Sequence, residues 1–285
     1  MINNILILST EFHYKNKIGL ENMLNYFKCH YKFGDIHEIN NFDIIYSPCI
    51  PINTSNYSDK KFIFGPQFSV FPEDSQMNII ENVYNNCIYI QPSEWVVNLW
   101  SSFNVEKWLP LKSFPFPVDT IKFCPLDNER NKVFIYFKRR KPDELNCVEN
   151  LLKSNKIEYI IFDYVNKYDE NDYLHYLQES KYGIILDAHE SQGFAIEEAL
   201  SCNVPLLVWN TKYMSQEYGS SYADYPCTTI PYWDDRCGEF FYNENELEKT
   251  FNIFIDKLNT YNPRQYILDN LSVDKCAENF INLCK

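Results

Sequence analysis

Short runs of hydrophobic residues recur along the chain and alternate with longer stretches of helical periodicity. In the first half the runs lie at Ile5–Leu8, Asp43–Tyr46, Lys61–Phe64 and Cys87–Ile90. In the second half they lie at Val133–Phe137, Tyr159–Phe162, Gly183–Leu186 and Pro205–Val208. Runs of this length are typical of strands buried on both faces of a parallel sheet. The pattern therefore predicts an α/β fold.

Amphipathic stretches between and after these runs predict the helices. One opens at Gly19 and continues to Phe27, after a polar loop at Ser9–Lys17, and further stretches cover 93–100, 143–152, 169–180, 244–258 and 263–283. In each, apolar residues recur at the spacing of one helix face.

The chain of 285 residues exceeds the usual size of a single hydrophobic core, so two domains are expected. Prolines at 110, 115, 117 and 125 interrupt regular structure and predict a linker there. We assign residues 1–125 to a first domain, 126–262 to a second domain, and 263–285 to a C-terminal helix.

The composition of the chain limits the kinds of partner that we expect it to bind. A net charge of -13 argues against nucleic acid or an anionic membrane surface as the main partner. The ten cysteines form no C-x-x-C pair. The N-terminus lacks the basic region of a signal peptide, and no apolar run is long enough to cross a membrane. These features predict a soluble protein of the cytoplasm, or of the host cytoplasm if the chain is viral.

The positions of the seven glycines exclude two nucleotide-binding motifs. They stand at 19, 34, 65, 183, 193, 219 and 238, so neither G-x-G-x-x-G nor a Walker A loop can be written. No D-x-D is present either, which argues against carboxylates that hold a divalent ion on a diphosphate.

The stretch Tyr182–Trp209 predicts a strand, a polar turn, a short helix and a second strand. Glu190 lies in the turn and Glu198 about one turn inside the helix. Gly193 stands where the turn passes into the helix, so its backbone can approach a ligand while the helix start offers unpaired N–H groups to an anion. The alternative is an ordinary β-α-β unit with acidic residues on its surface.

This stretch resembles the E-x7-E signature of retaining glycosyltransferases with the GT-B architecture, the family-4-like group. The resemblance also includes the Ala-Leu after the second Glu and the Pro that opens the next strand. It implies two Rossmann-like domains with a deep inter-domain cleft, and a last helix that crosses back to the first domain. By motif position, Glu190 would contact the donor sugar, Gly193 would face the phosphates, and Glu198 would hold the ribose hydroxyls.

Residues next to these motif positions are further candidates for binding the nucleotide sugar. They are Ser191, Gln192 and Phe194 in the turn, and His189, which would touch the sugar or the phosphate or else serve packing. Glu197 lies about 100° round the helix from Glu198, so we expect it to be a solvated charge.

Four consecutive cations, Lys138–Lys141, follow the strand Val133–Phe137. Cations at this place would stabilise a departing diphosphate more in the transition state than in the ground state. Lys138 and Arg140 share a side if the strand continues, so they are the candidates, and the alternative is a basic surface turn. The resemblance adds Tyr164 and Val165 as residues that would stack on the base.

The first domain offers candidates for the acceptor or cleft. His13 lies in the loop after the first strand, Gly19 at the expected helix start, and Gly65 and Gln67 at the carboxyl end of a strand, where open α/β sheets bind ligands.

The sequence thus predicts a retaining glycosyltransferase that moves a sugar from a nucleotide-diphosphate donor to the hydroxyl of a glycan or other acceptor. No metal cofactor is expected, and a homodimer is compatible with the sequence. Two alternatives stay open: a GT-B protein that binds a sugar nucleotide without turnover, and a GT-B sugar-nucleotide epimerase.

Overall fold

The hydrophobic runs form two separate parallel sheets in two structural units. The structure is a computed structural model that describes residues 4–8, 12–73, 86–166 and 168–285. The first unit comprises the residues up to Pro117 together with Leu271–Lys285, and the second unit comprises Val118–Asn270. The sequence had placed these two boundaries at 125 and 263.

The first unit contains a six-stranded sheet in the order β2-β1-β3-β4-β5-β6, in which every pair is parallel. Its strands are β1 (Ile5–Leu8), β2 (Tyr31–Gly34), β3 (Ile44–Ser47), β4 (Lys61–Phe64), β5 (Cys87–Gln91) and β6 (Leu111–Ser113). The predicted runs supply β1, β3, β4 and β5. β6 falls in the segment that the sequence assigned to the linker, and β2 carries no continuous apolar run.

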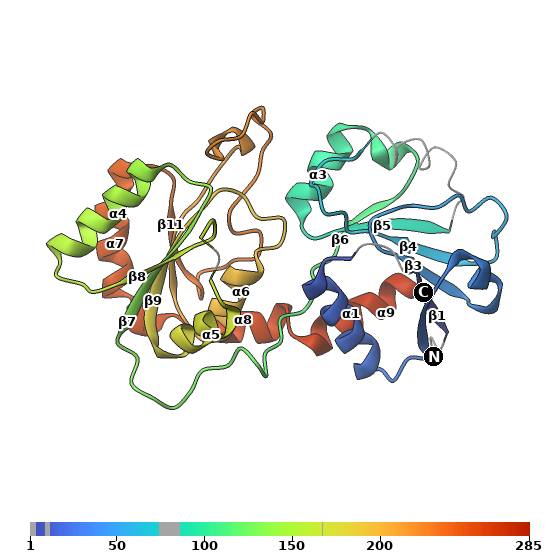
Figure 1. The fold of residues 1–285 in the computed structure, drawn as a ribbon, viewed down its shortest axis with the longest axis horizontal. Helices are drawn as coiled ribbons and strands as arrows, with labels where there is room; N and C mark the ends of the chain where they lie inside the picture. The colour runs from blue at the N-terminus through green and yellow to red at the C-terminus, as the bar shows by residue number, and fades with distance from the viewer. Residues whose placement is uncertain (1–3, 9–11, 74–85, 167) are drawn as a thin grey trace. The chain divides into compact units, whose positions relative to one another are not determined.

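Helices cover both faces of this sheet (Figure 1). α1 (Tyr14–Tyr26) and α9 (Val273–Cys284) pack together on one face, and α3 (Glu94–Ser102) lies on the other. Short 3-10 turns span Ile36–Asn41 and Val105–Lys107. Phe280 of α9 packs its ring 6.2 Å from that of Tyr46, so the C-terminal helix belongs to the core of the first unit.

The second unit contains a five-stranded parallel sheet in the order β11-β10-β9-β7-β8. Its strands are β7 (Lys132–Lys138), β8 (Ile160–Asp163), β9 (Ser180–Asp187), β10 (Leu206–Trp209) and β11 (Gly238–Phe241). Only β11 lacks a predicted counterpart. The chain passes from β7 to β8 on one side and returns to β9 on the other side of β7. The strand order therefore reverses between β7 and β9, where open α/β sheets bind ligands beyond the carboxyl ends of their strands.

The helices of the second unit also form a layer on each face of its sheet (Figure 1). α4 (Pro142–Ser154) and α7 (Glu244–Asp256) cover one face, and α5 (Glu170–Glu179), α6 (Phe194–Ser201) and α8 (Pro263–Asn270) the other. Further 3-10 turns span Met214–Gln216 and Leu258–Thr260. The stretch 263–283, predicted as one helix, forms two: the first helix ends at Asn270 and the second begins at Val273.

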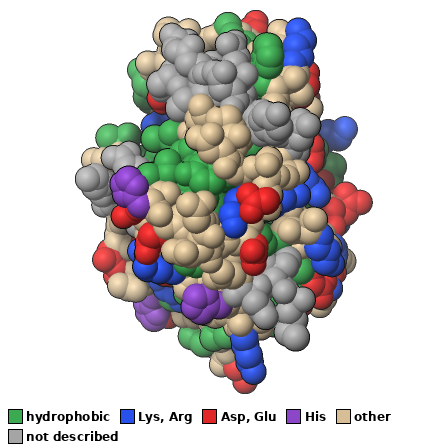
Figure 2. Space-filling view, turned by 90° about the vertical axis from the view of Figure 1, so that its right-hand side faces the viewer, with side chains coloured by type: hydrophobic (Ala, Val, Ile, Leu, Met, Phe, Trp, Pro, Cys, Tyr) green, Lys and Arg blue, Asp and Glu red, His purple; other side chains and the backbone are tan. Residues whose placement is uncertain are grey.

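Charges of both signs are mixed on one face of the molecule (Figure 2), and the cysteines are unpaired. On the face shown in Figure 2, acidic and basic side chains are interspersed over the described surface rather than gathered by sign. All ten cysteines are free. No helix in the described residues has the length and apolar character needed to span a bilayer.

Candidate active site

Lys138 and Asp187 end the two strands at which the order of the second sheet reverses. They are register partners across the parallel pair β7 and β9, so their side chains meet at the carboxyl edge of the sheet. Lys138 Nζ lies 3.7 Å from Asp187 Oδ2 and forms an ion pair with Glu190 Oε1 from the loop after β9. The aromatic ring of Tyr164 lies 4.7 Å from the same ammonium. We call Lys138, Asp187 and Glu190 the charged triad.

The pKa values of the two carboxyls in the charged triad are shifted in opposite directions. Burial raises the pKa of Asp187 well above its usual range, and the neighbouring Glu190 charge adds to this effect. Burial would also raise the pKa of Glu190, but the Lys138 ammonium and the contact with Asp187 outweigh it and lower that pKa. Glu190 therefore keeps its negative charge beside the Lys138 cation more readily than Asp187 does.

Lys138 stays charged in this environment. Burial alone would lower the pKa of its ammonium, but Asp187 and Glu190 overcome that effect and raise it. A buried cation at the carboxyl edge of a parallel sheet can bind an anion when one oxygen of that anion replaces a carboxylate oxygen beside it.

The start of α6 lies in the same loop as Glu190. Gly193 precedes the helix with φ +92°, a left-handed conformation that favours glycine, and an added Cβ would lie 3.4 Å from the Cβ of Glu190. The first-turn N–H groups of a helix have no partner within it, so this end attracts anions.

The far end of α6 is held by two arginines. Arg130 donates to the carbonyls of Cys202 and Asn203, and Arg264 donates to that of Ser201. Cations at the C-terminus of a helix satisfy its last carbonyls and complement its dipole. These contacts fix the axis of α6 and thereby the position of its N-terminal end beside the charged triad.

His189 is buried next to Glu190 and faces a different acid. Its Nδ1 lies 3.4 Å from Glu217 Oε2, and its side chain is 8% exposed. Burial lowers the pKa of His189 to about 4, in spite of the neighbouring Glu190 carboxylate. The imidazole is therefore neutral at pH 7 and can donate or accept one hydrogen bond.

The remaining motif residues take distinct positions. Ser191 and Phe194 are partly exposed in the loop and at the first turn of α6. Gln192 is buried, and its amide donates to Glu197 Oε2 at 3.0 Å. Glu198 is 5% exposed in the second turn of α6. Val165 is largely exposed beside Tyr164, after the carboxyl end of β8.

The prediction that Arg140 shares a side with Lys138 is wrong. β7 ends at Lys138, and Arg139 has φ +51°, so the chain turns before Arg140. The Arg140 side chain is 1% exposed and forms a two-point ion pair with Glu144. It also donates to the carbonyls of Asp187 and Trp209, so it holds the ends of β9 and β10 rather than facing a ligand.

The prediction for Glu197 is also wrong. It is 1% exposed rather than solvated, because the helix face that it occupies is covered. Its carboxylate accepts the Gln192 amide, so the pair ties the loop after β9 to the first turns of α6.

In the first unit, Gly19 does not open a helix. It lies in the second turn of α1, where an added Cβ would come 3.0 Å from Pro117 Cδ, so glycine is needed for packing. Residues 14–17, predicted as loop, are helical, and His13 directly precedes them with its ring 6.3 Å from that of Phe68. Residues 9–11 of that loop lie outside the described residues.

Gly65 is likewise buried in packing. It has φ +84°, and an added Cβ would come 2.4 Å from the carbonyl oxygen of Ile90. The Gln67 amide donates to the Phe71 carbonyl at 3.0 Å. The assignment of His13 and Gln67 to an acceptor site stays a prediction.

Asp187 is the member of the charged triad that sequence reasoning missed. It directly follows the apolar run Gly183–Leu186, so it stands at the carboxyl end of a predicted strand, as Gly65 does. Thr229 and Thr211 fix the backbone at this end: Thr229 Oγ1 lies 3.2 Å from the Asp187 carbonyl, and Thr211 donates to that of Ala188 at 2.6 Å. No short motif marks these threonines, because Thr211 follows the end of β10 and Thr229 lies in a distant loop.

The described residues contain no group of three or more His, Cys, Asp or Glu side chains placed to hold one metal ion. Comparison by sequence finds no match: no protein-family model and no curated protein matches this chain.

Comparison by structure does find similar proteins. The sucrose-phosphate synthase of Thermosynechococcus elongatus aligns over 99% of this chain and 98% of its own, with a TM-score of 0.61 and 10% identity. The catalytic domain of starch synthase IV from Arabidopsis thaliana, solved with ADP and acarbose, aligns over 95% of this chain and 76% of its own, with a TM-score of 0.52 and 12% identity.

TarM aligns over 85% of this chain with a TM-score of 0.54 and 15% identity, and this chain spans 54% of TarM. At such identities the likeness concerns the fold. It confirms the predicted α/β architecture of the GT-B type, with two Rossmann-like domains.

Proposed function

We propose that this protein is a retaining glycosyltransferase that moves a sugar from a nucleotide-diphosphate donor to a hydroxyl acceptor. The observation that carries the proposal is the charged triad at the reversal point of the second sheet, beside the start of α6. A cation and a helix N-terminus together suit a diphosphate, and an ionised carboxylate next to them suits the sugar. The fold that this chain shares with a sucrose-phosphate synthase and a starch synthase supports the same proposal.

Lys138 and the N–H groups at the start of α6 would hold the diphosphate. As the bond to the sugar breaks, negative charge grows on the leaving diphosphate, and a fixed cation stabilises that charge without reorganisation. Glu190 would give up its contact with Lys138 to a phosphate oxygen. Its carboxylate would then face the sugar hydroxyls or the positive charge that develops at the anomeric carbon.

The other motif residues would position the nucleotide and the sugar. Glu198 would accept hydrogen bonds from the ribose hydroxyls, and Tyr164, which already covers Lys138, would stack on the base. The neutral His189 would donate a hydrogen bond to the sugar or to a phosphate oxygen. Arg140 takes no direct part in this scheme, since its guanidinium is engaged by Glu144 and two carbonyls.

We further propose that turnover needs no metal ion, because Lys138 and the start of α6 supply the positive charge that a metal would otherwise bring. Transfer in the presence of EDTA at an unchanged rate is the expected result. A rate that falls on chelation and returns with Mg²⁺ or Mn²⁺ would contradict this part of the proposal.

The direct test is release of nucleoside diphosphate from UDP-, GDP- and ADP-sugars offered with simple hydroxyl acceptors. At least one donor should be consumed, and the product should keep the anomeric configuration of the donor by NMR. Donor binding without release would instead indicate a binding protein, and interconversion of donor sugars without an acceptor would indicate an epimerase.

Two variants separate binding from chemistry. Glu198→Ala should weaken the affinity for the nucleoside diphosphate, since it removes hydrogen bonds to ribose worth about 1 to 3 kcal/mol. Glu190→Ala should lower turnover more than it lowers that affinity. Unchanged nucleotide affinity in Glu198→Ala would contradict the ribose assignment.

A further inference from the structure

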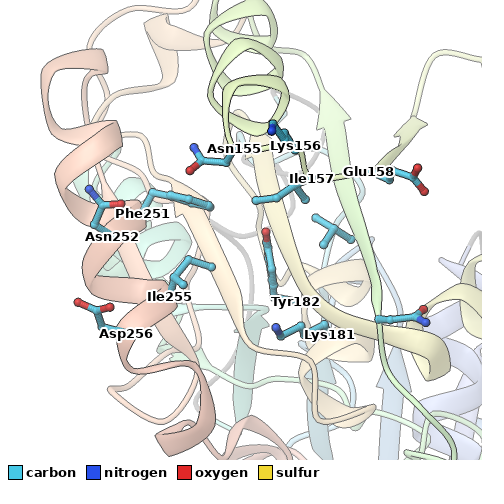
Figure 3. Close-up of a pocket in the computed structure, with 12 residues that line it drawn as sticks. Asn155, Lys156, Ile157, Glu158, Lys181, Tyr182, Phe251, Asn252, Ile255 and Asp256 are labelled. Carbon is cyan, nitrogen blue, oxygen red and sulfur yellow. The ribbon is translucent and has the colours of Figure 1, made fainter.

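A cavity lies in the second unit, at the amino ends of β7 and β9. It has a volume of about 450 Å³ and opens between the C-terminal ends of α4 and α7 (Figure 3). This volume falls within the range of about 300 to 1,000 Å³ that is common for small-molecule sites.

This cavity is separate from the charged triad. Tyr182 lines the cavity near the start of β9, and Asp187 ends the same strand. Five residues of extended strand, at about 3.3 Å each, place them about 17 Å apart at opposite edges of the sheet. A ligand here would not occupy the proposed donor site.

Tyr182 supplies a buried hydroxyl that the described residues leave without a hydrogen-bond partner. The residue is 3% exposed, and its phenol oxygen points toward the space between Ile157 and Phe251 (Figure 3). Burial raises the pKa of this phenol to about 12, so it keeps its proton and can donate. A buried donor without a partner costs free energy, and a ligand acceptor in the cavity would remove that cost.

The inner wall of the cavity is apolar and its rim is polar. Val133, Ile157, Phe251 and Ile255 form the apolar part together with the Tyr182 ring. The rim carries the exposed amides Asn131, Asn155 and Asn252. Such amides can both donate to and accept from hydroxyl groups.

The charges at the rim favour an uncharged ligand. Lys156 and Lys181 are offset by Glu158 and Asp256, so the rim has no net charge. The C-terminal ends of α4 and α7 bring partial negative charge to the same opening, which works against an anion.

We propose that this cavity binds a neutral saccharide unit. The C–H face of a pyranose ring suits the apolar wall, and its hydroxyls can accept from Tyr182 while they donate to and accept from the rim amides. This inference rests on the chemistry of the cavity and not on the proposed transferase activity.

The test is methyl NMR of the full chain labelled at isoleucine. Ile157 and Ile255 report on the cavity, and Ile253, on the outer side of α7, is the internal control. Signals are assigned with Ile→Val variants. Glucose, galactose, N-acetylglucosamine and maltose are titrated, with glucuronic acid and inorganic phosphate as charged probes. At least one neutral sugar should shift Ile157 and Ile255 but not Ile253, with saturation at millimolar concentration.

The Tyr182→Phe variant deletes only the hydroxyl. It should weaken the binding of that sugar by about threefold to tenfold, because one hydrogen bond to the ligand is lost. It should leave the melting temperature of the free protein unchanged or higher, because the deleted hydroxyl has no partner there. The matched control is Tyr173→Phe, whose hydroxyl donates to the Ala195 carbonyl on the opposite face of the sheet. This control should lower the melting temperature and leave sugar binding unchanged.

Three results would overturn the proposal: no shift at Ile157 and Ile255 with any neutral sugar, tighter binding of the charged probes, or equal sugar affinity in wild type and Tyr182→Phe. None of these measurements uses a nucleotide, so a protein without transferase activity could still bind sugar here. Conversely, an active transferase could fail this test.

Discussion

The ion pair between Lys138 and Glu190 makes a quantitative prediction about stability. The Lys138→Met variant removes the ammonium and leaves the Glu190 carboxylate buried without it. Both side chains are at most 17% exposed, so solvent screens the pair weakly. Breaking a buried pair from one side costs about 3 to 5 kcal/mol of unfolding free energy.

The partner variant should cost less. In Glu190→Gln the cation remains, and the Asp187 carboxyl, 3.7 Å away, can serve as its counter-ion. The double variant removes both charges of the pair. We therefore expect it to be more stable than the sum of the two single effects implies, with a coupling energy of about 1 to 3 kcal/mol.

The assay is chemical denaturation of the wild type, the two single variants and the double variant at pH 7. Additive losses, without a coupling energy, would refute the ion pair and with it the arrangement of the charged triad. A second readout comes from pH: in Lys138→Met the pKa of Glu190 should rise, because the cation that lowers it is gone. That variant should then lose less stability than wild type as the pH falls below about 4.5, the ordinary pKa of a glutamate.

Three further predictions concern the support of the site. In denaturant titration, Arg140→Met should lower the unfolding free energy by about 3 to 5 kcal/mol, because it breaks the buried ion pair with Glu144. Arg140→Lys should recover little of this loss, because lysine lacks the planar pair of donors that Glu144 engages. Between pH 6.5 and about 4, wild type should lose up to about 3 kcal/mol more stability than His189→Asn. The reason is that, as the pH falls, the histidine binds a proton in the unfolded state before it does so in the folded state. Equal pH profiles of the two proteins would contradict a buried neutral His189. Gly193→Ala should cost about 1 to 2 kcal/mol, since alanine is strained at φ +92°, and an unchanged melting temperature would contradict that conformation.

The buried strands of both sheets could be predicted from the sequence because parallel strands covered on both faces consist of apolar runs. Val133–Phe137 was predicted and lies within β7, and Ile5–Leu8 is β1 itself. Three edge strands, β2, β6 and β11, were missed. Edge strands need no continuous apolar run, as the partly exposed Tyr31–Gly34 illustrates.

The positions of two candidate residues could be predicted from their place at a strand end, while their roles stay predictions. Lys138 ends β7, and Glu190 follows β9, as the pattern indicated. Arg140 was misplaced because its position depends on the positive φ of Arg139, which no local pattern announces. Glu197 was misplaced because its burial comes from Gln192 and the surrounding fold rather than from helix periodicity.

The central claim is that the charged triad binds the diphosphate of a nucleotide. Thermal shift of wild type and Lys138→Met with UDP, GDP and ADP tests it most directly, with Lys153→Met, an exposed lysine of α4, as the matched control. We predict that at least one nucleoside diphosphate raises the melting temperature of wild type and of Lys153→Met, and that the rise shrinks in Lys138→Met. No rise with any of the three, or an equal rise in Lys138→Met, would contradict the account.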